Sequence, residues 1–165
     1  MPEKETLERA REDEREGKSP STQAGEFVKE EMDHIREGKH GARSTKQAIA
    51  IGLSKARRAG VKLPPSKASS KATRTKAAHD LRKGQSSAKK KTSAKRSRAI
   101  SGVLKREGRS AASKKSLSRQ AHQAARKRGS AARSQAAKKA VRSKGPAGRK
   151  QAARKAARTR QREAA

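Results

Sequence analysis

The chain has 165 residues, and its 47 Lys and Arg against 15 Asp and Glu give a formal net charge of +32 at pH 7. Leu, Ile, Val and Phe together make up only fifteen residues, too few for one large globular domain with a continuous core. The absence of Cys excludes a disulfide framework and a Cys-based zinc site, and no apolar run is long enough to cross a membrane. The sequence therefore predicts a cytoplasmic protein that does not bind membranes.

The positive charge is concentrated in the second part of the chain. Residues 1–65 contain fourteen Lys and Arg against twelve Asp and Glu, whereas residues 66–165 contain thirty-three against three. Within the first part, residues 1–37 have a net charge of −5 and residues 38–65 a net charge of +7. A long cationic segment is stabilised by a polyanion, because each phosphate contact releases condensed counterions. This asymmetry predicts a nucleic acid partner.

Residues 1–21 read as a charged leader that is a weak helix or disordered. Glu5 and Arg9 have helical i,i+4 spacing, but Leu7 and Ala10 are the only large or helix-forming apolar residues between positions 2 and 16. One such pair adds only about 0.2–0.5 kcal/mol to a helix. The leader then ends at a Ser-Pro pair, Ser19 and Pro20, which is typical of a helix start.

Residues 22–65 contain the strongest fold signal, a helical hairpin. The first apolar stripe has helical spacing and runs to about Glu37, before a break at Gly38-Lys39-His40-Gly41. Ser44 stands three residues before Gln47, which predicts a capping box in which each side chain binds the backbone N–H of the other. Gly60 supplies a left-handed cap that ends the second helix. The predicted hairpin core is Phe27, Val28, Met32, Ile35, Ile49, Leu53 and Val61.

A hairpin this small rarely folds alone, so we expect it to serve as a dimerisation or docking module. A homodimer through the hairpin is the predicted form of self-association, although the sequence leaves the oligomeric state open. The acidic first helix and the basic second helix favour an antiparallel arrangement, in which opposite charges face each other.

Residues 66–165 form a basic, low-complexity tail rich in Ala, Lys, Arg and Ser. Three stretches within it, 111–128, 131–144 and 149–162, have good helix formers and are separated by Gly129 and by Gly145-Pro146. Repulsion between like charges opposes these helices in isolation. The tail is therefore expected to be disordered or helical on binding, and the predicted fold class is mostly α and disordered.

Enzyme chemistry finds little support in the sequence. His34 and His40 are six residues apart across a glycine break and have no clear third ligand. The glutamates between positions 26 and 37 fit the solvent face of a helix better than a pair of general acids. The sequence thus predicts a protein that is not an enzyme, with no catalytic residue, cofactor, metal site or small-molecule substrate.

One family resemblance rests on about forty residues. The segment Glu26-Phe27-Val28-Lys29-Glu30-Glu31-Met32, the Lys39-His40-Gly41 turn and the Gln47-Ala48-Ile49-Ala50-Ile51 helix resemble a small bacterial family of uncharacterised domains. Some of its members are labelled plasmid stabilisation or DNA-binding proteins. The tail resembles, in composition, the Lys/Ala-rich termini of linker histones and bacterial histone-like proteins. The resemblance implies a bacterial nucleoid setting and transfers no catalytic residue.

Together these features predict sequence-independent binding and compaction of duplex DNA by a nucleoid-associated, histone-like protein. Phe27 is the only aromatic residue, so base stacking is not a plausible mode of recognition. Association with RNA or the ribosome is one alternative, and an interaction module localised by its basic tail is another. The predicted phosphate contacts are Lys39, Arg43, Lys46, Lys55, Arg57, Arg58, Lys62, Lys89, Lys90, Lys91, Lys95, Arg96, Arg126, Lys127, Arg128, Arg133, Lys138, Lys139, Arg149, Lys150, Arg154, Lys155, Arg158, Arg160 and Arg162.

Overall fold

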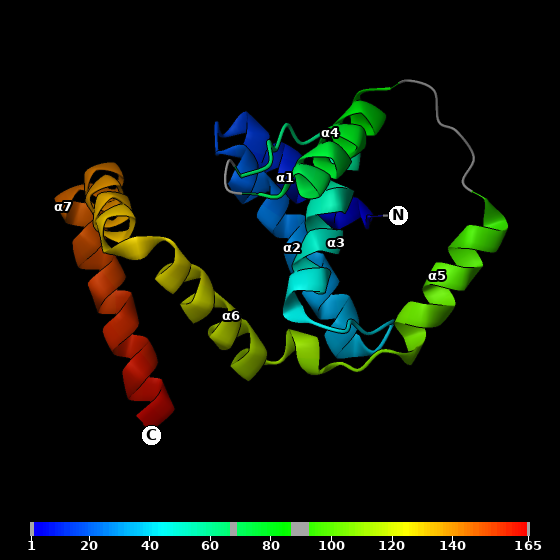
Figure 1. Cartoon of the computed structure of the whole chain (residues 1–165). Coiled ribbons are helices and arrows are strands. Elements are labelled where there is room, and N and C mark those ends of the chain that lie inside the picture. The colour runs from blue at the N-terminus through cyan, green and yellow to red at the C-terminus, as the bar shows by residue number, and fades with distance from the viewer. Residues whose placement is uncertain (1, 67–68, 87–92, 165) are drawn as a thin grey trace. The chain divides into compact units, whose positions relative to one another are not determined.

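A computed structural model of the chain describes residues 2–66, 69–86 and 93–164 (Figure 1). The described residues contain α-helices, one short 3-10 helix and no strand. In chain order these elements are α1 (Lys4–Arg15), α2 (Pro20–Glu37), α3 (Thr45–Arg58), α4 (Lys71–Gln85), α5 (Ala94–Arg106), η1 (Ser110–Ala112), α6 (Lys114–Lys127) and α7 (Gly129–Ala164). No helix among these residues combines the length and the apolar composition needed to cross a membrane.

The predicted fold class, a short hairpin followed by a disordered low-complexity tail, is wrong. The structure is 80% helical, and α4 to α7 occupy most of the basic region. Ala, Lys, Arg and Gln have high intrinsic helix propensity, and this outweighs the few tenths of a kcal/mol lost for each pair of like charges. Serine side chains also cap the helix starts: Ser70 accepts from the Thr73 N–H, and Ser113 accepts from the Ser116 N–H.

Helices α2 and α3 form an antiparallel hairpin at the centre of the first part of the chain (Figure 1). Gly38 ends α2 in the left-handed conformation, with φ of 79°, which suits a residue without a Cβ. Ser44 begins α3 and accepts a hydrogen bond from the Gln47 N–H, as the capping box predicts. The Gln47 side chain instead accepts from the N–H of Arg43, one residue earlier than the capping box predicts.

Helix α1 packs against α2 and completes a small buried cluster. Phe27 is fully buried there, in contact with a set of mostly small residues from α1, α2, α3 and the turn after α3: Ala10, Ala24, Ala56 and Val61. Thr6 of α1 is also fully buried. The leader is therefore an ordered part of this core, because its two predicted apolar positions face α2 rather than water.

A second cluster lies at the other end of the hairpin, where η1 contacts both α2 and α3. It contains Met32, Ile35, Ala42, Ala48, Ala111 and Ala112. Thr45 Oγ1 donates to the Ala111 carbonyl at 2.7 Å, and Arg36 Nε donates to the Ala112 carbonyl at 3.2 Å. The apolar faces of the hairpin are thus covered from within the chain, by α1 at one end and by η1 at the other.

The loop between α2 and α3 also meets the end of α5 through its backbone. The Gly41 N–H donates to the Leu104 carbonyl at 2.8 Å, and the Ala42 N–H donates to the Gly108 carbonyl at 3.1 Å. A Cβ at position 41 would collide with the carbonyl group of Glu107. Glycine is required at this position because two backbone segments come into direct contact.

Helix α4 packs along α3 and is held there by a buried carboxylate. Asp80 is only 2% exposed; its Oδ2 accepts from Ser54 Oγ at 2.7 Å and its Oδ1 accepts from Arg58 Nε at 2.8 Å. Near the end of α4, Gly84 lies against the Arg57 carbonyl, and a Cβ there would collide with it. A single acidic residue of the basic region therefore attaches α4 to the hairpin.

By its internal contacts the chain divides into two units, Met1–Gln120 and Ala121–Ala165. The second unit contains the end of α6 and all of α7, and it has no buried side chain among residues 121–162. Gly145 interrupts α7 with φ of 61° and ψ of 178°, so two helical stretches meet at a kink immediately before Pro146. The separations predicted at Gly129 and at Gly145-Pro146 correspond to the start of α7 and to this kink.

Candidate functional site

Several predicted phosphate contacts of the first unit are paired with carboxylates instead. Lys39 Nζ lies 3.0 Å from both Glu3 Oε1 and Glu37 Oε2, and hydrogen bonding, to Glu3 above all, raises the pKa of Lys39. Arg58 is the ion-pair partner of the buried Asp80. An intramolecular carboxylate already balances the charge of each, which weakens the attraction of either side chain for a phosphate.

Lys55 lies between two buried carboxylates. Its Nζ is 2.7 Å from Glu31 Oε2 and 3.2 Å from Glu30 Oε1, and both glutamate side chains are only 1% exposed. The expectation that these glutamates belong to the solvent face of α2 is wrong, because α3 and the N-terminal segment cover that side of the helix. Lys55 therefore stabilises the contact between α2 and α3 and is not free to bind a phosphate.

Other predicted contacts of the hairpin remain accessible. Arg43, Lys46 and Lys62 are exposed, and none of them forms an ion pair within the described part of the chain. Arg57 is half-buried, and its Nε donates to the Leu63 carbonyl at 3.0 Å. Among the predicted contacts of the hairpin, the exposed and unpaired ones are thus few: Arg43 and Lys46 lie at the start of α3, and Lys62 lies after its end.

The predicted contacts beyond the hairpin form a much denser basic surface. All of those that the structure describes are exposed, and within the described residues none pairs with a carboxylate. Lys89, Lys90 and Lys91 lie outside the described residues. The others are Lys95, Arg96, Arg126, Lys127, Arg128, Arg133, Lys138, Lys139, Arg149, Lys150, Arg154, Lys155, Arg158, Arg160 and Arg162.

The surface of α6 and α7 is larger than the predicted set. Residues 114–162 contain eighteen Lys and Arg and no Asp or Glu, and all eighteen are exposed. The additional members have the same exposure and the same lack of carboxylate neighbours: Lys114, Lys115, Arg119, Arg142 and Lys144. The composition of the sequence alone contained this signal, since no acidic residue interrupts the stretch. We refer to residues 114–162 as the basic helical surface.

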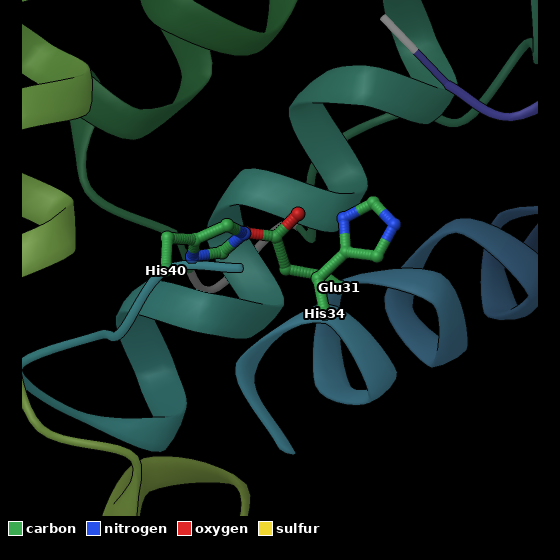
Figure 2. A group of neighbouring side chains, drawn as sticks. All are labelled: Glu31, His34 and His40. Carbon is green, nitrogen blue, oxygen red and sulfur yellow. The ribbon is translucent and has the colours of Figure 1, made fainter. Parts of the chain in front are cut away.

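A different kind of cluster forms where α2 ends. Glu31 and His34 lie one helical turn apart on α2, and the loop after Gly38 brings His40 back beside them (Figure 2). Each offers one ligand atom, and these atoms all lie within 4.8 Å of one another. His40 Nε2 is 3.3 Å from Glu31 Oε1, and the two imidazole rings are nearly perpendicular, with centroids 6.0 Å apart. Sequence reasoning missed the third member, although Glu31 precedes His34 by three residues, the spacing that places two helical side chains on one face.

Glu3 connects this cluster to the N-terminal segment. Its Oε1 accepts hydrogen bonds from His34 Nε2 at 2.8 Å and from Lys39 Nζ at 3.0 Å. Hydrogen bonds from His34 and Lys39 stabilise the carboxylate and lower the pKa of Glu3 to about 2. Glu3 is therefore ionised at neutral pH, and its hydrogen bond holds the His34 ring in one orientation.

Residues 19–67 match a family of unknown function (DUF6496). No curated protein and no solved structure matches the chain.

The matched residues contain α2, the following loop and α3. They thus include Glu31, His34 and His40 as well as Lys55, whereas Glu3 and the basic helical surface lie outside the match. The two features of functional interest, the polar cluster and the basic helices, therefore belong to different parts of the sequence.

Proposed function

We propose that the protein binds duplex DNA without sequence preference, through contacts between the basic helical surface and phosphates, and that it compacts DNA as a histone-like component of the bacterial nucleoid. The supporting observation is that all eighteen basic side chains of residues 114–162 are exposed and none has a carboxylate partner within the described chain. Such a surface repels itself, and phosphates relieve that repulsion while releasing their counterions.

The helical form of this surface favours a duplex as the partner. An α-helix with its side chains is about 10–12 Å wide, and the major groove of B-DNA is about 12 Å wide. Single-strand binding uses aromatic rings on which bases stack, and the only aromatic residue of the chain, Phe27, is fully buried. RNA remains the competing partner, because its phosphates attract the same side chains.

The lack of sequence preference follows from the side chains that the surface presents. Base readout depends on a few polar side chains held in a fixed direction, often in bidentate pairs with base edges. In residues 114–162 the exposed positions are mostly Lys, Arg, Ala, Ser and Gln, and the cations recur on all sides of α7. Contacts of this type position a protein on the phosphate backbone without reading sequence.

A salt titration of the full chain on a duplex of arbitrary sequence tests the proposal. Replacing Arg149, Lys150, Arg154 and Lys155 by Gln should reduce the slope of log affinity against log salt by about 3 to 4, since each phosphate contact contributes about 0.9 on duplex DNA. A matched control replaces four exposed cations of α1 and α2 by Gln: Lys4, Arg11, Arg15 and Lys29. We expect the slope of this control to equal that of the unaltered chain.

Three outcomes would overturn the proposal. Equal loss of slope in both variants would mean that net charge, rather than the basic helical surface, determines binding. Stronger binding to structured RNA than to duplex DNA at physiological salt would replace DNA by RNA as the partner. A preference for one duplex among several unrelated sequences would reject binding without sequence preference.

A further inference from the structure

The cluster of Glu31, His34 and His40 has more acceptor atoms than donors to satisfy them. His34 Nε2 faces the Glu3 carboxylate at 2.8 Å, and His40 Nδ1 faces the Gly41 carbonyl at 3.1 Å. Both partners can only accept hydrogen bonds, so each of these two nitrogens must carry the ring proton. In the neutral rings, the opposite nitrogens, His34 Nδ1 and His40 Nε2, then carry no proton, and each has a free lone pair.

This arrangement is the one that surrounds histidine ligands in metal proteins. A metal-bound imidazole almost always donates its other N–H to a carboxylate or a backbone carbonyl, which fixes the tautomer and the ring orientation. His34 has the carboxylate partner and His40 the carbonyl partner. Figure 2 shows the His40 ring directed at the Glu31 carboxylate, with one nitrogen edge of His34 on its other side.

The net negative charge of the buried residues beside the cluster also favours binding of a cation. Glu30 and Glu31 are both buried, and Lys55 is the one ammonium group between them, so a single negative charge is left uncompensated within this group of three. Lys55 lies on the Oε2 side of Glu31, and neither Glu31 oxygen accepts a hydrogen bond of good geometry. Leaving a buried carboxylate unpaired is costly, and a cation beside Oε1 would remove that cost.

We infer that Glu31, His34 and His40 form a binding site for a divalent transition metal, with Zn²⁺ as the ion that fits best. Two imidazoles and one carboxylate are a ligand set that zinc accepts, with a fourth position open to water. Ligand distances of about 2.0–2.2 Å place two ligands of a tetrahedral centre about 3.4 Å apart. The 3.3 Å between His40 Nε2 and Glu31 Oε1 already meets this spacing. The His34 and His40 side chains are 13% and 17% exposed, which leaves an entry path from solvent.

The bound ion would hold the loop between α2 and α3 against the end of α2. His40 stands one residue before Gly41, whose N–H binds the Leu104 carbonyl at the end of α5. Fixing His40 to α2 therefore also fixes the backbone on which α5 and η1 are docked. The predicted consequence is that metal binding stabilises the first unit, because the ligands come together only in the folded chain.

The test uses the full chain after removal of metal by a chelator. Calorimetric titration with Zn²⁺ should show one equivalent bound, and Co²⁺ should produce the visible absorption of a four-coordinate N/O site. Thermal unfolding should move to higher temperature as Zn²⁺ is added. His40→Gln and His34→Gln should each weaken Zn²⁺ binding by at least about 10-fold and remove the Co²⁺ absorption.

The other two histidines provide matched controls. His79 and His122 are exposed residues of α4 and α6, so His79→Gln and His122→Gln should leave both Zn²⁺ and Co²⁺ binding unchanged. Circular dichroism of each variant shows whether it folds, and Glu31→Gln gives a third test if one histidine variant does not. Unchanged Zn²⁺ binding in the folded His40→Gln and His34→Gln variants would overturn the inference. So would nitrogen NMR that finds the same doubly protonated His40 at neutral pH with and without added Zn²⁺, because a proton would then occupy the place of the metal.

Discussion

Gly52 of α3 lies directly against Val28 of α2, so close that a Cβ at position 52 would come within 2.8 Å of the Val28 Cα and 3.0 Å of the Phe27 carbonyl oxygen. The two helices of the hairpin therefore meet backbone to backbone at this point. Side chains larger than hydrogen can be accommodated only by moving one helix away from the other.

Gly52→Ala is expected to lower the free energy of unfolding by about 1–3 kcal/mol, the usual cost of overpacking a close contact. Gly25→Ala is the matched control, because Gly25 lies within α2 and has no atom within 4 Å of its added Cβ. It should raise the free energy of unfolding by up to about 1 kcal/mol through helix propensity alone. Urea unfolding followed by circular dichroism measures both, and similar changes in the two variants would contradict the close contact.

Lys55→Met should destabilise the protein by about 3 kcal/mol. The substitution removes the only ammonium group between the buried carboxylates Glu30 and Glu31 and leaves both charges unpaired. Lys46→Met on the same helix is the control, and it should stay within about 0.5 kcal/mol of the unaltered chain because Lys46 is exposed and unpaired. If the free energy of unfolding changes equally in both variants, the ion pairs of Lys55 do not stabilise the fold.

The Asp80 carboxylate should stabilise the attachment of α4 in a pH-dependent way. Burial raises the pKa of Asp80, but hydrogen bonds from Ser54 and Arg58 lower it by more, so the folded pKa lies below the ordinary value of about 3.9. A depressed pKa stabilises the fold above the ordinary value, and this contribution is lost as the pH falls through the folded pKa. The free energies of unfolding of the unaltered chain and of Asp80→Asn should therefore differ at pH 7, and the difference should shrink as the pH falls below the ordinary value of about 3.9 and through the lower folded pKa. A difference that stays constant down to pH 2 would assign the effect to shape rather than to charge.

Thr45→Val should weaken the attachment of η1. The Thr45 hydroxyl is buried and donates to the Ala111 carbonyl at 2.7 Å, so its loss leaves that carbonyl without a partner and costs about 1–2 kcal/mol. The control is Thr75→Val, since Thr75 is an exposed residue of α4 that donates only to a carbonyl of its own helix. Proteolysis near residues 104–113 should become faster in Thr45→Val and remain unchanged in Thr75→Val.

The sequence predicted the local structure of the hairpin better than its surroundings. Helical spacing and cap residues such as Ser44 and Gly38 are short-range signals, so α2 and α3 can be recognised from a few neighbouring positions. The contacts that cover the hairpin involve distant partners, such as Thr45 with Ala111, sixty-six residues apart. No local sequence pattern predicts such a contact between distant residues.

The polar cluster shows why the candidate site was only partly predictable. His34 and His40 stood out in the sequence, but Glu31 had been read as part of the solvent face of α2. A helical position next to an apolar stripe becomes buried when a neighbouring segment extends over it, and here the covering groups are α3 and the segment around Glu3. The basic helical surface, in contrast, follows directly from composition, because eighteen cations without an acid have no partner in the same stretch.

The docking of residues 104–112 onto the hairpin relies on carbonyl groups throughout. Arg36, Gly41, Ala42 and Thr45 all donate, and the acceptors are the main-chain oxygens of Leu104, Gly108, Ala111 and Ala112. Every residue type has the same main-chain oxygen. Most substitutions in this segment should therefore leave its hydrogen bonds to the hairpin intact. Only the small size at Ala111 and Ala112 is constrained, since both are buried. The donors all lie within the family-matched residues, whereas the acceptors all lie outside them, so the matched hairpin supplies every side chain and N–H group of this contact and the later segment supplies only main-chain oxygens.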